Sequence, residues 1–345
     1  MGHAKIAWPF FLCENSVDWR LIMFHWCFIG TGRLANIVAR QLMKSGRHDI
    51  VSCYSRNEVS RNAFARKYHS KAYCDPLDAI KDKDVDAVYV VTPHNVHFKF
   101  AKMALREGRP VFLEKPFTVS ADETTQLIEL ARQKDVFLAE AMWTWYHGAS
   151  LQVRKWIEDG MLRDIKKVRF TYHLNSVHYA KRVADPKRAG GALLDITVYP
   201  IAYAYSLFGL PDEIEASARI ENGIDLTDEI IFIYSDGKRV EISTSIMDYH
   251  GLERLRIDSS DGFIKVSSYH HANRASLVRS GKKFVYHPKE PRHISYVYEF
   301  DEVEESIRKG LKESSSYPLS TTMEVMGLIE RIKGQIGLKY TQLEK

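Results

Sequence analysis

The sequence predicts an α/β fold of two domains, in which a doubly wound parallel sheet is followed by an α+β domain with a large, mainly antiparallel, open-faced sheet. Three observations support this prediction. A chain of 345 residues exceeds the usual size of a single hydrophobic core. Strand-like apolar runs alternate with helix-like runs up to about residue 139. After Trp143 the pattern changes to short alternating runs separated by turn signals such as Ser260-Asp261-Gly262.

The N-terminal elements follow from apolar runs and helix stop signals. Gly46 and Gly108 follow amphipathic runs and are natural helix ends. Strands are expected at 24–29, 48–54, 86–91, 110–114 and 136–139, and helices at 33–45, 96–107 and 121–133. Because strand ends in such a sheet face a ligand crevice, the loops 92–95 and 114–116 are expected to converge there.

The C-terminal elements are expected to form one large sheet with helices on a single face. Strands are expected at 167–174, 213–220, 228–234, 239–246, 254–258 and 263–267, and helices at about 149–159, 192–208, 299–309 and 321–336. The last three helices would cover one face of the sheet. In the run 239–246, Val240 and Ile242 point one way, while Glu241 and Ser243 point the other. Since an open sheet of this size is normally buried against a partner, we expect a homodimer or tetramer assembled through it.

Composition narrows the function classes. The net charge of +5 is modest and the basic residues are scattered, which argues against nucleic-acid binding. No apolar run approaches the length of a membrane span. The four cysteines lack metal-ligand spacing, and Cys27 and Cys53 fall in expected buried strands, which favours a reducing compartment, the cytoplasm. His270 and His271 have no third ligand at metal spacing, so no metal site is expected.

The most informative motif is the run Gly30-Thr31-Gly32-Arg33-Leu34-Ala35, which lies between an apolar strand and an amphipathic helix. The first glycine permits a tight turn, the second lets the backbone approach a pyrophosphate, and Ala35 lets helix and strand pack closely. The helix N-terminus attracts phosphates. The motif therefore predicts a dinucleotide-binding Rossmann domain.

The loop after the second strand bears on which dinucleotide binds. An NAD site favours an acidic residue here, but this chain has Ser55 and Arg56. A hydroxyl and a guanidinium can bind a 2′-phosphate through charge-assisted hydrogen bonds, so NADP is favoured. Arg56 could equally be a solvated loop cation, and Glu58 lies close enough to keep NAD as the alternative.

The first 22 residues are expected to be an extension or a non-native segment. The run 6–13 is apolar but short, and no small-residue cleavage site follows it, so a signal peptide is not expected. Met23 is the more natural start. The expected organisation is an extension at 1–22, a dinucleotide-binding domain at 23–143, and a substrate-binding and dimerisation domain at 144–345.

Four motifs in order resemble a known family. They are Gly30-x-Gly32-x-x-Ala35, Thr92-Pro93, Glu114-Lys115-Pro116 and Gly190-Gly191-Ala192-Leu193-Leu194-Asp195-x-x-x-Tyr199. Together they resemble the glucose–fructose oxidoreductase / inositol dehydrogenase (Gfo/Idh/MocA) family over residues 23–345. The runs 140–144 and 55–56 make the chain most similar to the NADP-dependent dihydrodiol / D-xylose dehydrogenase branch.

The resemblance implies an NAD(P)-dependent oxidoreductase that transfers a hydride between the cofactor and a secondary alcohol of a sugar, cyclic polyol or dihydrodiol. The expected cofactor contacts are Gly30, Thr31, Gly32, Arg33, Leu34, Ser55, Arg56, Thr92, Pro93, Asn95, His97, Glu114, Lys115 and Trp143. The expected substrate contacts are Lys115, Trp143, His178, Arg182, Asp195 and Tyr199. Many relatives have arginine after the Met-Trp-Thr triplet, where this chain has Trp145.

The expected catalytic residues are Lys115, Tyr199 and Asp195. Pro116 favours an extended Lys115 at the crevice, and four-residue spacing places Asp195 and Tyr199 on one helix face. At ~4 Å and an effective dielectric near 20, a lysine ammonium and a phenolate attract by roughly 4 kcal/mol. That attraction would lower the phenol pKa by up to about three units. Tyr199 would then accept the substrate proton, with Asp195 orienting the pair or binding a substrate hydroxyl.

Two other functions are compatible with these motifs. The first is a glycosidase that uses bound NAD(P) transiently. The second is a non-enzymatic regulator that senses the dinucleotide, although such proteins commonly lack the lysine that this chain has as Lys115.

Overall fold

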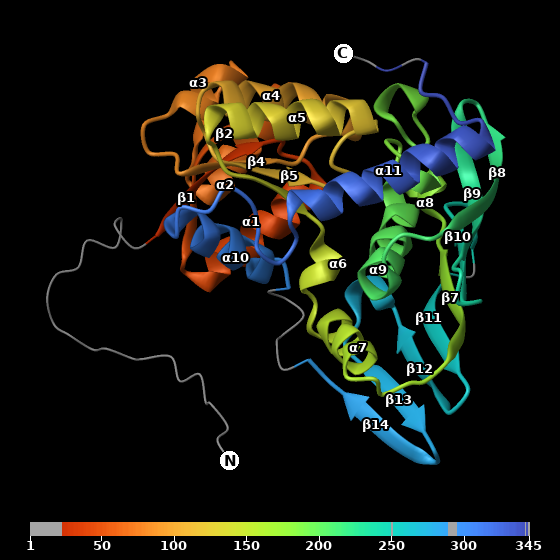
Figure 1. Cartoon of the computed structure of the whole chain (residues 1–345). Helices are drawn as coiled ribbons and strands as arrows, with labels where there is room; N and C mark the ends of the chain where they lie inside the picture. Colours follow the sequence, from red (N-terminus) through yellow and green to blue (C-terminus); the bar gives the residue numbers. More distant parts are fainter. Residues whose placement is uncertain (1–22, 250, 289–294, 342, 344–345) are drawn as a thin grey trace, which may run out of the picture.

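The computed structural model describes residues 23–249, 251–288, 295–341 and 343, and it consists of two sheets with helices packed around and between them (Figure 1). The first sheet is parallel and has the strand order β3-β2-β1-β4-β5-β6. Its elements are β1 (Phe24–Ile29), α1 (Arg33–Ser45), β2 (His48–Tyr54), α2 (Glu58–Tyr68), β3 (Lys71–Tyr73), α3 (Pro76–Lys81), β4 (Ala87–Val90), a 3₁₀ turn (His94–Val96), α4 (His97–Arg106), β5 (Val111–Glu114), α5 (Ala121–Lys134) and β6 (Leu138–Ala141). The α/β fold class predicted from the sequence is confirmed.

The N-terminal elements differ from the prediction in helices α2 and α3, which were not predicted, and at the sheet edges. Strand β3 was not predicted, because it is only three residues long and two of these are exposed, so it lacks an apolar run. Strand β6 ends at Ala141 rather than at residue 139. Helix α1 ends before Gly46, whose φ of 68° is left-handed, as the glycine stop signal predicts.

The second sheet has eight strands in the order β14-β13-β12-β11-β7-β10-β9-β8. Its elements are α6 (Trp143–Tyr146), α7 (Gly148–Glu158), β7 (Ile165–His173), α8 (Ser176–Tyr179), a π-turn (Leu193–Thr197), α9 (Val198–Phe208), β8 (Glu213–Glu221), β9 (Ile224–Ile233), β10 (Arg239–Ser245), β11 (Leu252–Ser259), β12 (Gly262–Ser267), β13 (Ala275–Arg279) and β14 (Lys282–Tyr286). All pairs are antiparallel except β7 with β10. Strands β13 and β14 were not predicted.

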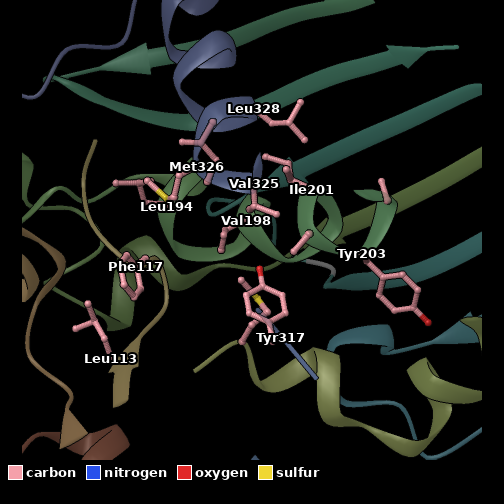
Figure 2. Packing of buried hydrophobic residues seen from close by; sticks show 14 of the residues in the cluster. Leu113, Phe117, Leu194, Val198, Ile201, Tyr203, Tyr317, Val325, Met326 and Leu328 are labelled. Carbon is pink, nitrogen blue, oxygen red and sulfur yellow. The ribbon is translucent and has the colours of Figure 1, made fainter. Parts of the chain in front are cut away.

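One face of this sheet is covered by α9 and by α11 (Leu319–Ile336) (Figure 1). Val240 and Ile242 are fully buried beneath the helices, while Glu241 and Ser243 lie on the other face, as alternation predicts. The same hydrophobic cluster reaches the first sheet through Leu113 (Figure 2). One continuous hydrophobic core therefore extends from the second sheet to the first.

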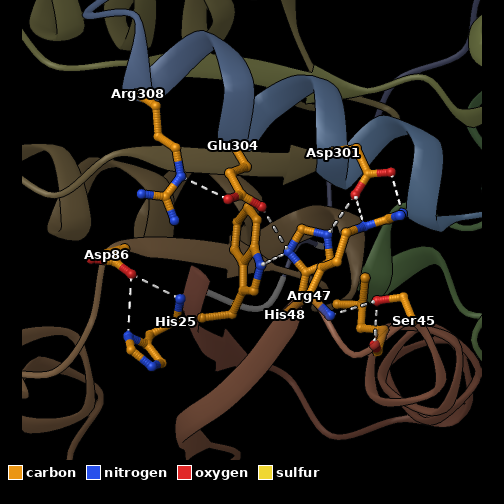
Figure 3. A network of polar contacts seen from close by, with 10 residues as sticks. His25, Ser45, Arg47, His48, Asp86, Asp301, Glu304 and Arg308 are labelled. Carbon is orange, nitrogen blue, oxygen red and sulfur yellow. Dashed lines mark hydrogen bonds and ion pairs between the residues drawn. The ribbon is translucent and has the colours of Figure 1, made fainter. Parts of the chain in front are cut away.

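Helix α10 (Val297–Arg308) packs on the N-terminal half, so the prediction that it covers the second sheet was wrong. Its Phe300 ring lies 4.8 Å from the Trp26 ring and 5.1 Å from the Phe112 ring, measured between centroids. Polar contacts reinforce this packing, since Arg47 donates two hydrogen bonds to Asp301 (Figure 3). An amphipathic pattern predicts that a helix is buried on one face, but not which sheet it covers.

The buried His48 ring completes the contact between α10 and the N-terminal half. Its Nε2 lies 3.0 Å from an Asp301 oxygen, and its Nδ1 accepts a hydrogen bond from the Trp26 indole and faces Glu304 at 3.5 Å (Figure 3). His48, Asp301 and Glu304 lie close enough to hold a metal ion. Arg47 and Arg308 already neutralise the two carboxylates, however, so these contacts describe an ion-pair network.

One helical stretch, Pro186–Phe208, is long and apolar enough by composition to cross a membrane. Its most apolar window is 72% buried inside the protein, which is typical of a core helix. Cys27 and Cys53 are buried free thiols, and Cys74 is exposed. The expected N-terminal extension, Cys13 included, lies outside the described residues.

Candidate active site

The glycine turn after β1 has the geometry of a phosphate-binding loop. Gly30 adopts a φ of +118°, and a Cβ at this position would lie 2.5 Å from the carbonyl oxygen of Val91. Only glycine fits there. Gly32 immediately precedes α1 and faces open space, with nothing within 4 Å of an added Cβ. The turn therefore brings bare backbone to the crevice.

Two further features fit a dinucleotide phosphate. No side chain in the described structure caps the first turn of α1, so its backbone N–H groups remain available to an anion. The Thr92 hydroxyl is buried and has no hydrogen-bond partner among the described residues. Buried polar groups are normally paired, so this hydroxyl is a candidate ligand contact.

Ser55 and Arg56 lie in the loop that follows β2, where the edge of the crevice meets the protein surface. Arg56 is exposed, and Ser55 is half-buried. The buried Arg61 guanidinium donates a 2.9 Å hydrogen bond to the Ser55 carbonyl oxygen and so supports the loop from beneath. Sequence reasoning missed Arg61, because only the fold shows that its helix turns back under this loop.

The loops after β4 and β5 converge through one histidine. The fully buried His97 ring lies 2.9 Å from the Thr92 carbonyl oxygen at Nε2 and 2.9 Å from the Pro116 carbonyl oxygen at Nδ1. Burial lowers the pKa of His97 to about 4, so its ring is neutral and donates only one of these bonds at a time. This residue joins the two loops, so the predicted cofactor contact of His97 stays a prediction.

Lys115 lies at the centre of the polar cluster. Its Nζ donates a 2.6 Å hydrogen bond to the backbone carbonyl oxygen of Asp195 and lies 4.0 Å from the Asp195 carboxylate. Arg182 donates a 2.6 Å hydrogen bond to the same carboxylate. The structure thus brings together Lys115, Asp195 and Arg182, all of which the sequence analysis selected.

Burial and mutual charge set the protonation of this cluster. Burial, aided by Arg182, lowers the pKa of Lys115 despite the neighbouring Asp195. For Asp195, burial raises the carboxyl pKa, but Arg182 and Lys115 outweigh that effect and the pKa is lowered. Asp195 is therefore a carboxylate, and Lys115 is an amine whose proton is held less tightly than usual.

Tyr199 lies against Lys115, but in a different arrangement from the one predicted. The Lys115 Nζ lies 4.4 Å from the centroid of the Tyr199 ring, over its face. Burial, with Tyr296 and Glu114 nearby, raises the pKa of Tyr199 well above its ordinary value. The prediction that Lys115 lowers the pKa of Tyr199 toward neutrality was therefore wrong, because desolvation dominates.

Glu114 is turned into the protein beneath Lys115. Its carboxyl accepts a 2.6 Å hydrogen bond from the Tyr89 hydroxyl and a 3.2 Å hydrogen bond from the Lys115 backbone N–H. Burial raises the pKa of Glu114 to about 7. These contacts fix the end of β5, and the predicted cofactor contact of Glu114 stays a prediction.

Arg182 is held by a contact that sequence reasoning missed. Its Nη1 lies 3.0 Å from Nε2 of the buried His94, whose Nδ1 lies 3.2 Å from the Ala189 carbonyl oxygen. Burial, followed by Arg182, lowers the pKa of His94 well below its ordinary value, so the neutral ring can accept from the guanidinium. The sequence carried no signal for this pair, because His94 and Arg182 lie 88 positions apart.

Aromatic rings form another wall of the site. Trp143 is buried and stacks on Tyr296 with ring centroids 4.5 Å apart. The His270 ring lies 5.9 Å from the Tyr199 ring, and its Nδ1 lies 2.7 Å from a Glu253 oxygen. His270 is therefore an aromatic neighbour of Tyr199 and also contacts Glu253, which the test for metal spacing could not reveal.

Beyond Trp143 lies a cavity of about 600 Å³ beside α6, α7 and α10. His147 and His271 line it and also pack on the Trp143 ring at 4.6 and 5.1 Å. Trp145 also lines the cavity, and the Arg154 guanidinium lies 4.3 Å from its ring centroid. The described residues that line this cavity do not include Lys115, Asp195 or Tyr199, so it is separate from the polar cluster.

His178 lies apart from the polar cluster. It is exposed, stacks on Tyr249 and lies 3.0 Å from the Tyr249 hydroxyl. Its predicted substrate contact stays a prediction, as do those of Asn95 and Pro93 with the cofactor.

Two protein-family models match this chain. A family model described as "Oxidoreductase family, NAD-binding Rossmann fold" matches residues 24–142, and the "GFO/IDH/MocA C-terminal domain" matches residues 150–265. The trans-1,2-dihydrobenzene-1,2-diol dehydrogenase of Xenopus laevis is 30% identical over 91% of this chain and 98% of its own. The mouse (Mus musculus) protein of that name is 28% identical over 92% and 98%.

Solved structures share the fold. A 3-ketoreductase from Actinomadura kijaniata in complex with NADP and TDP-benzene superposes with a TM-score of 0.79 at 19% identity, covering 91% of this chain and 98% of that one. An aldose-aldose oxidoreductase from Caulobacter crescentus in complex with glycerol superposes with a TM-score of 0.79 at 18% identity, covering 91% and 97%.

Proposed function

Because the chain belongs to the Gfo/Idh/MocA oxidoreductase family, we propose that it uses NADP(H) to interconvert a secondary alcohol and a ketone of a sugar, cyclic polyol or dihydrodiol. The observation that carries this proposal is the cluster of Lys115, Asp195 and Tyr199 at the end of β5, beside a glycine turn that fits a dinucleotide. The dehydrogenase relatives and the NADP complex of a structural neighbour support it.

Each site residue receives a role from its surroundings. When bound, the nicotinamide supplies the hydride acceptor or donor. Lys115 exchanges the proton of the substrate hydroxyl, because burial lowers its pKa and so weakens its hold on the proton. Tyr199 remains a phenol and donates a hydrogen bond to the substrate oxygen. Asp195 holds Lys115 and Arg182 in place.

Cofactor preference rests on the loop after β2. Ser55 and Arg56 offer a hydroxyl and a guanidinium to a 2′-phosphate, and the loop has no carboxylate at the position that an NAD ribose favours. The bare turn at Gly30 and Gly32, with the unpaired Thr92 hydroxyl, would hold the pyrophosphate and neighbouring groups.

The test is a panel of aldoses, cyclic polyols and dihydrodiols, followed by the absorbance of reduced nicotinamide with NADP and NAD in parallel. We expect turnover with at least one class and tighter binding of NADP. Tyr199→Phe keeps the ring under Lys115 and removes only the hydroxyl, so it should lower turnover while leaving the Kd of NADP unchanged. Tight NADP binding with no turnover on any class would contradict the proposed reaction.

The assembly proposal is a homodimer through the open face of the second sheet. Ile231 lies on this face between Glu241 of β10 and Glu215 of β8, to which it is paired in register. Charges there already pair across strands, as in Lys167 with Glu241 and Arg169 with Asp258. A second copy would present the same self-complementary pattern. Placement in the cytoplasm is likewise proposed, because Cys27 and Cys53 are free thiols.

A further inference from the structure

Two buried carboxyl groups lie behind the helix that carries Asp195. Asp225 and Asp228 belong to β9, and both are fully buried. Burial, followed by the neighbouring Asp228, raises the pKa of Asp225 well above its ordinary value. Burial also raises the pKa of Asp228 to about 6, although hydrogen bonds with Thr197 and Asp225 lower it. Two interacting carboxyls in a buried place do not both ionise readily, so the pair keeps a proton near neutral pH.

This pair contacts both ends of the π-turn. Asp225 accepts a 2.5 Å hydrogen bond from the backbone N–H of Leu193, the first residue of the turn. Asp228 accepts a 2.6 Å hydrogen bond from the hydroxyl of Thr197, the last residue. Thr244 of β10 adds a hydroxyl 2.6 Å from that of Thr197. Asp195 lies between the two anchored ends.

The glycine before the turn makes room for this contact. Gly191 has a φ of +109°, and a Cβ there would lie 2.1 Å from an Asp225 carboxyl oxygen. Any other residue would push the carboxyl away from the Leu193 N–H. The Gly190-Gly191 pair is thus explained in part by the space that Asp225 needs.

The wide turn changes what the backbone offers to Lys115. The Val198 N–H bonds to the carbonyl oxygen of Leu193, five residues earlier, rather than to the residue four back. A π-turn is rare, and its widened ladder releases backbone groups from their usual helical partners. The carbonyl oxygen of Asp195 accepts the Lys115 ammonium instead.

We propose that Asp225 and Asp228 are positioning residues, which hold the π-turn at both ends so that the carbonyl and carboxylate of Asp195 face Lys115. The kinetic part of this proposal rests on the proposed function, whereas its structural part does not. The prediction is that loosening one anchor misplaces Asp195 without disturbing the dinucleotide loop, which belongs to the other sheet.

The test uses a matched pair of variants at one anchor. Thr197→Val removes the hydroxyl and keeps the shape, whereas Thr197→Ser keeps the hydroxyl. We expect Thr197→Val to lower kcat about tenfold, a hydrogen-bond effect, with the Kd of NADP unchanged, and Thr197→Ser to restore kcat. Asp225→Asn, which has the shape of the protonated carboxyl, should retain most activity.

Two readouts are independent of turnover. In Thr197→Val, backbone amides of residues 193–199 should exchange with deuterium faster, and Lys115 should react faster with acetic anhydride, as read by peptide mass spectrometry. Peptides from β1 and α1 serve as the internal control. Unchanged exchange and labelling, or an equal increase in β1 and α1, would overturn the proposal. If the wild-type protein shows no redox turnover, the proposed function fails, and these two readouts still decide whether the turn is held as proposed.

Discussion

Lys115 and Asp195 face each other across the site, but they are held in different ways. Lys115 follows β5 directly, and Glu114 and Tyr89 fix that strand end from within the same sheet. Asp195 lies on a π-turn whose ends are tied to carboxyl groups of a strand about 30 positions later. One side of the site thus depends on a strand end, and the other on tertiary contacts. We expect substitutions on the first side to affect chemistry directly, and those on the second to act through position.

The largest effect is expected from Lys115→Met. Loss of the amine removes the proposed proton exchange, and general acid–base groups contribute roughly 100-fold to 10,000-fold to turnover. The Kd of NADP should change little, because the glycine turn is untouched. Steady-state kinetics and a fluorescence titration measure the two quantities. Near-normal turnover in this variant would assign the proton transfer to another group and remove the functional contrast between the two sides.

The next largest effect is expected on the preference between NADP and NAD. Ser55→Asp places a carboxylate where the 2′-phosphate would lie, so repulsion should weaken NADP relative to NAD by about tenfold or more, which is about 1.4 kcal/mol. Titration with each reduced cofactor measures the ratio of the two Kd values. Glu58→Gln is the matched control, since Glu58 lies nearby and is exposed, and it should leave the ratio nearly unchanged. An unaltered ratio in Ser55→Asp would show that this loop does not select the cofactor.

This contrast also explains what the sequence could predict. The glycine turn, the buried strands and Lys115 follow from patterns within a few residues, and these were placed correctly. The sequence also selected Asp195, Arg182 and Tyr199 near Lys115, but it did not predict the tertiary contacts that hold them. Neither the contact of Arg182 with His94 nor the packing of α10 has a local signature. The pKa of Tyr199 was predicted in the wrong direction, because a pairwise charge estimate omits the desolvation that burial imposes.

A smaller effect, on the pH dependence of stability, is expected at a contact that joins the two halves of the molecule. Glu140 of β6 accepts a 2.8 Å hydrogen bond from Thr322 of α11, and burial raises its pKa to about 8. The folded protein therefore keeps this carboxyl protonated, whereas the unfolded chain releases the proton above a pH of about 4.5. The contribution of Glu140 to the free energy of unfolding therefore falls as the pH rises from about 4.5 to about 8, with a limiting slope of about 1.4 kcal/mol per pH unit.

Glu140→Gln keeps the hydrogen-bond acceptor and does not titrate. The variant should match the wild type in acid and exceed it in free energy of unfolding at mildly alkaline pH, as measured by urea denaturation at a series of pH values. If the free energy of unfolding changed with pH in the same way for both proteins, the prediction would be contradicted. Glu129→Gln, at an exposed carboxyl of α5, serves as the control.

The smallest effect on turnover is expected from Ile231→Arg. It places a charge on the open sheet face, on the strand next to the β8 edge, so it should shift the protein from dimer to monomer at micromolar concentration while each site stays active. Sedimentation velocity measures the assembly. Val59→Arg, at an exposed position of the N-terminal half, is the control and should leave assembly unchanged. A wild-type protein that is already monomeric would contradict the proposed interface.

The position of α10 determines how the nucleotide-binding half can be exchanged between genes by recombination. Phe300 completes an aromatic cluster with Trp26, Tyr89 and Phe112 at centroid distances of 4.8 to 5.1 Å. The nucleotide-binding half is therefore encoded in two separated stretches of the gene, with the second sheet between them. A recombination event that transferred only the first stretch would leave these rings exposed to water, so relatives can exchange this half intact only when both stretches move together.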